Sequence, residues 1–199
     1  MTTDLFQFGD NATPLSDEER RALIPSLTTR AELNQVERLN IQAARVWAMR
    51  PGALRRTDHL TDGFARELHR RMFNKVWRWA GRYRTTAKNL GWEVPRLTEG
   101  VHNALADAQT WLDHSTYPLQ EIAVRLHHRL VAIHPWSNGN GRHARLMADV
   151  VVASREGEPL TWGAGGDLIA MSAVRRRYIG AIRAADRGEI GPLLEFARN

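Results

Sequence analysis

The sequence has no cysteine among its 199 residues, which excludes a disulfide framework and a thiolate metal site. No apolar run approaches the length of a membrane-spanning helix. The first residues, MTTDLFQFGDNATPL, lack the basic start and apolar stretch of a signal peptide. We therefore expect a cytoplasmic protein with no membrane partner, although the lack of cysteine by itself suits any compartment.

Lysine is nearly absent, since Lys75 and Lys88 are the only two. The net charge of +6 and the pI of 10.6 therefore come from arginine. Such a charge permits a nucleic-acid or phosphate-rich partner. Neither a run of basic residues nor a recognised nucleic-acid motif is present. We expect a solvated basic surface rather than a nucleic-acid interface.

A chain of this length builds one domain with a sizeable core. Helix caps and apolar residues at helical spacing predict a mainly α fold, with helices over residues 16–24, 31–49, 62–76, 98–113, 119–133, 142–154, 172–185 and 190–197. The first two helices begin with capping-box patterns, Ser16 with Glu19 and Thr29 with Glu32. β-forming residues on both sides of Asn89-Leu90-Gly91 predict one small hairpin, from Tyr83 to about Leu97.

The segment IHPWSNGNGRHAR, residues 133–145, has a composition that no core requires. Its glycines allow positive φ and close approach of a ligand to the backbone. The helix that follows them presents unpaired amides and the positive end of its dipole to an anion. Arg142 and Arg145 lie on neighbouring parts of one helical face, and guanidinium groups match phosphate oxygens. The segment therefore indicates a polyphosphate site.

His134 comes directly before this loop, where a neutral imidazole can accept a proton from a hydroxyl. The pattern thus indicates phosphoryl or nucleotidyl transfer to a hydroxyl. Each feature alone has a simpler explanation, because Asn-Gly pairs form turns and a histidine at a helix end is usually structural. Their conjunction within one loop favours the functional interpretation.

The segment HPWSNGNGRHAR resembles the signature of the Fic (Fido) family. LHHRLVAIHPW, ELHRRMFNKVWRWAGRYRT and YIGAIRAADRGEIGPLLEFA are also similar to that family. With ATPLSDEERRALIP and TTRAELNQVERLNI, the chain is most similar to the bacterial branch named mobile mystery protein B. The resemblance implies a Fic-type helical bundle with a β-hairpin flap. It further implies an N-terminal extension over residues 1–27 and one Fic domain over 28–199.

The resemblance implies a protein adenylyltransferase, which transfers AMP from ATP to a hydroxyl of a target protein. His134 matches the general base. The nucleotide-binding positions are matched by Gly139, Asn140, Gly141, Arg142 and Arg145. Trp136 replaces the usual phenylalanine, and we expect it to anchor the loop in the core.

Asn138 stands where the family usually has an acidic ligand of Mg²⁺. An asparagine oxygen can still contact the ion, or it can merely shape the turn. The predicted hairpin matches the flap that holds the target, with Lys88 and Asn89 at its tip. The target protein is not identified by the sequence, and some relatives imply an antitoxin-like partner.

Glu32 has two competing interpretations. Thr28, Glu32 and Asn34 align with a family motif in which the glutamate binds the second motif arginine and inhibits the enzyme. Leu33, however, occupies the usual glycine position, and Glu32 equally fits a helix cap. We expect autoinhibition through Glu32, within a candidate inhibitory helix near residues 28–40.

Two other functions stay open. One is a different Fic chemistry, such as phosphate transfer, use of another nucleotide or removal of AMP. The other is a non-catalytic module that binds a nucleotide or nucleic acid.

Overall fold

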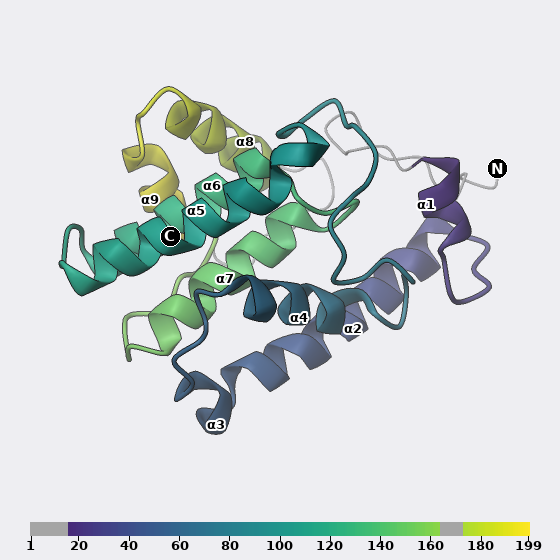
Figure 1. Cartoon of the computed structure of the whole chain (residues 1–199), viewed down its shortest axis with the longest axis horizontal. Coiled ribbons are helices and arrows are strands. Elements are labelled where there is room, and N and C mark those ends of the chain that lie inside the picture. The colour runs from purple at the N-terminus through teal and green to yellow at the C-terminus, as the bar shows by residue number, and fades with distance from the viewer. Residues whose placement is uncertain (1–15, 164–172) are drawn as a thin grey trace.

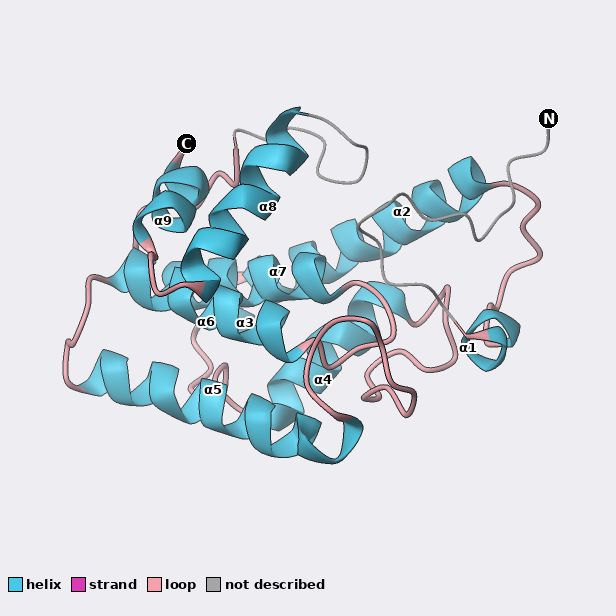
Figure 2. Cartoon of the chain, turned by 90° about the horizontal axis from the view of Figure 1, so that it is seen from above, coloured by secondary structure: helices cyan, strands magenta, loops and turns pink. Residues whose placement is uncertain are grey.

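The computed structural model describes residues 16–163 and 173–199, and their secondary structure is almost entirely helical (Figures 1 and 2). The helices are α1 (Asp17–Arg21), α2 (Arg30–Met49), α3 (Pro51–Leu54), α4 (Asp62–Phe73), the 3₁₀ helix η1 (Val94–Arg96), α5 (Leu97–Asp113), α6 (Leu119–Ile133), α7 (Asn140–Ala153), α8 (Ala173–Asp186) and α9 (Gly191–Arg198). The predicted mainly α fold is confirmed. The expected start of one helix at Ser172 lies outside the described residues.

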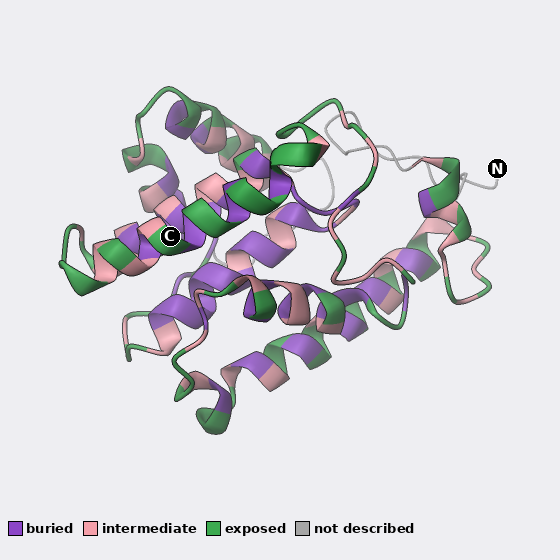
Figure 3. Cartoon of the chain, in the orientation of Figure 1, coloured by how far each residue is buried: buried purple, intermediate pink, exposed green. Residues whose placement is uncertain are grey.

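Helix α7 occupies the centre of the bundle, and most of its residues are buried (Figure 3). It packs against α6, which in turn packs against α5, and it also contacts α2 and α4. Helices α8 and α9 pack against each other and against α6. This arrangement holds the N-terminal end of α7 in the middle of the molecule, where the chain arrives from α6.

Both predicted capping boxes are present at the starts of their helices. Ser16 and Glu19 cap α1, while Thr29 and Glu32 cap α2. In each, the hydroxyl accepts a bond from the backbone amide of the glutamate, whose carboxylate accepts one from the cap residue. Among the described residues, no helix has the length and apolarity needed to cross a membrane.

The predicted hairpin from Tyr83 to Leu97 is wrong in its secondary structure, because the described part of the chain contains no strand beyond an isolated bridge between Leu23 and Trp77. The segment is a loop that ends in η1. Its backbone bonds run to the end of α6 instead of across a hairpin. Arg84 N donates to Pro135 O at 2.9 Å, and Trp92 N donates to Ile133 O at 3.0 Å.

Candidate functional site

His134 is the residue at which α6 ends, and its backbone adopts the left-handed conformation, with φ 55° and ψ 56°. Its N–H still donates to Leu130 O at 3.1 Å. Burial, with the nearby charges of Arg84 and Lys88, lowers the pKa of His134 to about 4. The imidazole is therefore neutral near pH 7 and able to accept a proton.

The loop of residues 83–93 holds His134 from outside the bundle. The buried Arg84 donates from Nε to His134 O at 2.7 Å and from Nη1 to Thr86 O at 2.9 Å, and it also donates to Trp92 O. Gly91, with φ 93°, lies against the histidine, because a Cβ at this position would be 2.4 Å from the His134 Cβ. These contacts were missed from the sequence, where Gly91 indicated only a turn and Arg84 carried no signal.

The glycine loop presents the start of α7 without a side-chain cap. Gly139 has φ 80°, and a Cβ there would lie 2.3 Å from the Phe73 ring, so the close packing requires glycine. The side chain of Asn140 is buried and bonds both backbone groups of Trp136, at 2.9 and 2.8 Å. Asn140 thus shapes the loop with its side chain and leaves its backbone for the predicted anion site.

Two buried histidines and Trp136 support the loop from the core. His69 stacks on Trp136 with ring centroids 4.1 Å apart, and its Nε2 lies 3.2 Å from Asn138 O. Trp136 Nε1 donates to His143 Nδ1 at 3.2 Å. The expectation that Trp136 anchors the loop fits its 1% exposure.

Arg142 is bound by Glu37, a residue of α2 that the sequence analysis did not select. Glu37 is only 2% exposed and accepts bonds from Arg142 Nη1 at 2.6 Å, Trp77 Nε1 at 2.8 Å and Asn138 Nδ2 at 3.0 Å. A signal was available, because Glu37 lies at helical spacing within the buried stripe of α2, which consists of Leu33, Glu37, Asn40, Ala44 and Ala48.

Arg145 lies one turn further along α7, with its guanidinium carbon 5.4 Å from the ring centroid of Tyr178. Burial lowers the pKa of Arg145, which still leaves it charged at any ordinary pH. It lines a pocket of about 170 Å³ together with Ile41, Arg45, Arg142, Leu146, Asp149 and Trp162. That volume suits a phosphate group but is smaller than a typical ligand site of roughly 300–1,000 Å³.

Asn138 directs its side-chain oxygen into the loop, whereas its side-chain nitrogen donates to Glu37. Its Oδ1 accepts from Gly139 N at 2.7 Å and faces Arg142 Nη2 at 3.4 Å. A metal contact through this oxygen would compete with both donors, so the geometry matches the turn-shaping interpretation. The described residues also contain no group of three or more histidine, aspartate or glutamate side chains that could hold a metal ion.

The expectation that Glu32 binds Arg145 is wrong in this structure. The exposed Glu32 accepts bonds from the Thr28 and Thr29 amides, at 2.8 and 3.0 Å. The same backbone bonds, with one from the Thr28 hydroxyl, lower its pKa. Glu32 is a helix cap at the start of α2, and the carboxylate that reaches a motif arginine is Glu37.

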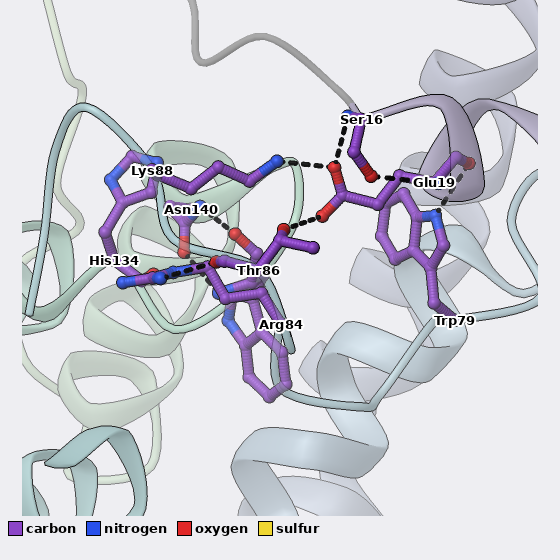
Figure 4. Close-up of polar contacts among 9 residues, drawn as sticks. Ser16, Glu19, Trp79, Arg84, Thr86, Lys88, His134 and Asn140 are labelled. Carbon is purple, nitrogen blue, oxygen red and sulfur yellow. Dashed lines mark hydrogen bonds and ion pairs between the residues drawn. The ribbon is translucent and has the colours of Figure 1, made fainter. Parts of the chain in front are cut away.

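Lys88 and Asn89 were expected to contact the target at the tip of a hairpin. Asn89 is exposed, whereas the side chain of Lys88 is buried. The Lys88 side chain is 4% exposed and pairs with Glu19 of α1. Figure 4 shows Lys88 extending from beside His134 towards Glu19. The loop around His134 is therefore tied to the N-terminal segment of the chain.

The sequence was compared with protein-family models and with curated proteins. Residues 59–152 match the Fic/DOC family model. The protein adenylyltransferase fic-1 of Caenorhabditis briggsae is 34% identical over 134 residues, which are 65% of this chain and 25% of that protein. The chain thus spans about a quarter of the length of this curated relative.

Two solved structures share the fold. BepC of Bartonella tribocorum with bound AMPPNP has a TM-score of 0.65 at 15% identity, covering 92% of this chain and 97% of that one. Fic-1 from Caenorhabditis elegans has a TM-score of 0.65 at 24% identity, covering 91% and 52%. Residues 59–152 thus match the Fic/DOC family model, and the two solved structures show that the chain shares their fold.

Proposed function

We propose that this protein transfers AMP from ATP to a hydroxyl side chain of a target protein. The observation that carries the proposal is the position of a half-buried, neutral His134 at the start of the loop that leads to Arg142 and the uncapped N-terminus of α7. The curated relatives with which the chain shares its family domain are named protein adenylyltransferases.

In the proposed reaction, His134 accepts the proton of the target hydroxyl as its oxygen attacks the α-phosphorus of ATP. A new O–P bond forms, the bond to the β-phosphate oxygen breaks, and pyrophosphate leaves. The first amides of α7 and the guanidinium groups of Arg142 and Arg145 bind the phosphates and stabilise their negative charge. Mg²⁺ entering with ATP would offset phosphate charge, and Asn138 is the residue of this chain that could contact it.

We further propose that α2 inhibits the reaction through Glu37 rather than Glu32. The Glu37 carboxylate occupies Arg142, the cation that the phosphates require. It lies beside the pocket of about 170 Å³ at Arg145, which Arg142 also lines. Binding of ATP in a productive position therefore requires Glu37 to release Arg142.

The test is incubation of the protein with ATP labelled on the α-phosphate and a bacterial lysate. We expect label that stays on protein after denaturation and is absent with the His134→Ala variant. The same incubation with ATP labelled on the γ-phosphate gives no protein label if AMP is the group transferred. Label from the γ-phosphate alone identifies phosphate transfer and contradicts the proposal.

Finer features of the proposal follow from the sequence resemblance. They are the mobile mystery protein B branch, a bacterial source, a cytoplasmic location and an antitoxin-like partner. Co-purification of the tagged protein from its own cells tests the partner, and fractionation of those cells tests the location.

A further inference from the structure

Glu19 of α1 is enclosed by donors from three parts of the chain. Its Oε2 pairs with Lys88 and accepts from Ser16 N at 2.7 Å, while Oε1 accepts from the Thr86 hydroxyl at 3.1 Å. The Ser137 side chain, from the motif loop, also lowers the pKa of this carboxylate. Burial by itself raises the pKa of Glu19, but these hydrogen bonds outweigh it, so the pKa lies below its ordinary value and the group is ionised.

Three of these donors do not belong to α1. Lys88 and Thr86 come from the loop that holds His134, and Ser137 comes from the chain directly after His134. Together they surround one carboxylate beside the proposed general base, and we name them the acid pocket. Figure 4 shows two of them, Lys88 and Thr86, bonded to Glu19 near His134. A target hydroxyl that reaches His134 must bring its neighbouring residues to this same surface.

The helix that fills the acid pocket is short, with five residues. A helix of this length is not stable by itself. Apart from the Glu19 carboxylate, Trp79 Nε1 donates to Glu19 O at 3.3 Å, and Arg78 donates to Arg21 O at 3.3 Å and to Ala22 O at 2.9 Å. The bridge between Leu23 and Trp77 follows. The bridge lies after α1, so α1 can leave the pocket while the bridge remains.

We propose that the acid pocket of Lys88, Thr86 and Ser137 receives an acidic side chain of the target protein, and that Glu19 is its intramolecular stand-in. The inference rests on the proposed function for the existence of a target. It assigns to the target a glutamate or aspartate near the modified hydroxyl. It also makes α1 a competitor that the target displaces.

A binding experiment tests the pocket without any transfer. Two fluorescent peptides carry the sequence of residues 14–25, one with glutamate and one with glutamine at the position of Glu19, and their anisotropy is titrated with the full chain. We expect the Glu19→Gln chain to bind the glutamate peptide about tenfold more tightly than the glutamine peptide, since hydrogen bonds to a charged group are strong. Adding Lys88→Met to that chain removes the difference.

Glu18→Gln is the matched control, because Glu18 is an exposed carboxylate on the same helix. This chain keeps its own Glu19 in the pocket, so both peptides bind it weakly. Equal affinity of the Glu19→Gln chain for the two peptides overturns the proposal, as does a preference that survives Lys88→Met. Hydrogen exchange provides a second measurement in the Lys88→Met chain. The Arg20 amide donates to Ser16 O at 2.9 Å within α1, whereas the Ile24 amide donates to Val76 O at 2.9 Å beside the bridge. Release of α1 should therefore accelerate exchange at Arg20 before Ile24. Unchanged exchange at Arg20 contradicts the role of Lys88 in holding α1.

Transfer of AMP to serine peptides then separates this inference from the proposed function. If the wild-type chain labels lysate proteins but Glu19→Gln gains nothing towards acidic peptides, only the acid pocket is wrong. If no protein is labelled while the peptide preference holds, the proposed function fails and the pocket stands.

Discussion

The two sides of His134 are each closed by a buried glutamate from the N-terminal part of the chain, but the two closures differ in strength. On the nucleotide side, Glu37 belongs to α2, a helix of 20 residues that packs along α4. On the target side, Glu19 belongs to α1, which has five residues. Glu37 is therefore fixed by the core, whereas Glu19 is held mainly by its own polar contacts. The target side should open more easily than the nucleotide side.

The largest effect on the rate of transfer is expected at His134, which lies between the two sides. His134→Ala removes the proposed base and should lower transfer by roughly 10²–10⁴-fold. ATP affinity should change little, because the proposed phosphate contacts are made by α7 and the arginines rather than by the imidazole. Labelling rates and calorimetric ATP titrations measure the two quantities. Transfer at the wild-type rate would exclude His134 as the base.

Gly91→Ala should displace His134 through the loop of residues 83–93 and lower the rate of transfer. The new Cβ would lie 2.4 Å from the His134 Cβ and 2.8 Å from Ile133 O, so the loop or the histidine must move. A displacement of about 1 Å can cost on the order of 10²-fold in rate. Gly188→Ala is the control, because Gly188 also has positive φ, 91°, but open space around it. Equal losses in the two variants would attribute the effect to backbone strain alone.

Low pH should lower the stability of the folded protein through His134. The pKa of His134 is about 4 in the folded protein, below about 6.5 for an unfolded chain, so the unfolded state binds the proton more readily. Stability should therefore fall as pH drops from about 6.5 towards 4, by up to roughly 3 kcal/mol for a fully buried histidine and less for this partly buried one. Urea unfolding of the wild type and of His134→Gln between pH 7 and 4.5 measures the share of this residue. Parallel curves would show that His134 contributes nothing.

The nucleotide side is tested by Glu37→Gln, which keeps an acceptor for Trp77 and removes the charge that pairs with Arg142. We expect ATP affinity to rise about tenfold, since the phosphates no longer compete with a buried carboxylate. Glu32→Gln is the matched control on the same helix, and it should leave ATP affinity unchanged with a small decrease in melting temperature. A rise in ATP affinity with Glu32→Gln would support Glu32 as the inhibitory residue. Unchanged ATP affinity with Glu37→Gln would exclude Glu37 from that role.

The two capping boxes show how far the sequence could predict this molecule. Ser16 with Glu19 and Thr29 with Glu32 follow the same local pattern, and both helix starts form as expected. A cap depends on residues three positions apart, so sequence alone is enough. What each glutamate does beyond its helix depends on distant segments. Glu19 is buried against Lys88, while Glu32 is exposed. The local pattern is the same in both cases, so it could not distinguish them.

The same limit explains the other differences around His134. The glycine loop and the helix after it are local features, and the motif placed His134, Gly139 and Arg142 in one segment. The loop of residues 83–93 had β-forming residues but no partner strand, because its amides bond Ile133 and Pro135, far away in the sequence. Arg84 completes that loop by binding three carbonyl groups, a role that depends entirely on the folded chain.

The smallest effect is expected from Asn138→Asp, which acts on the nucleotide side through charge alone. The aspartate offers Mg²⁺ an anionic oxygen, so the magnesium concentration for half-maximal transfer should fall by a factor on the order of a few. It also places a carboxylate where Asn138 Nδ2 now donates to Glu37 Oε1 at 3.0 Å. Repulsion between the two carboxylates should loosen Glu37 and raise ATP affinity by a second route. The double variant with Glu37→Gln separates these causes, because only the metal effect survives in that background. A magnesium midpoint that is unchanged by Asn138→Asp in the presence of Glu37→Gln, with ATP saturating, would leave Asn138 as a residue that shapes the turn and does not contact the metal.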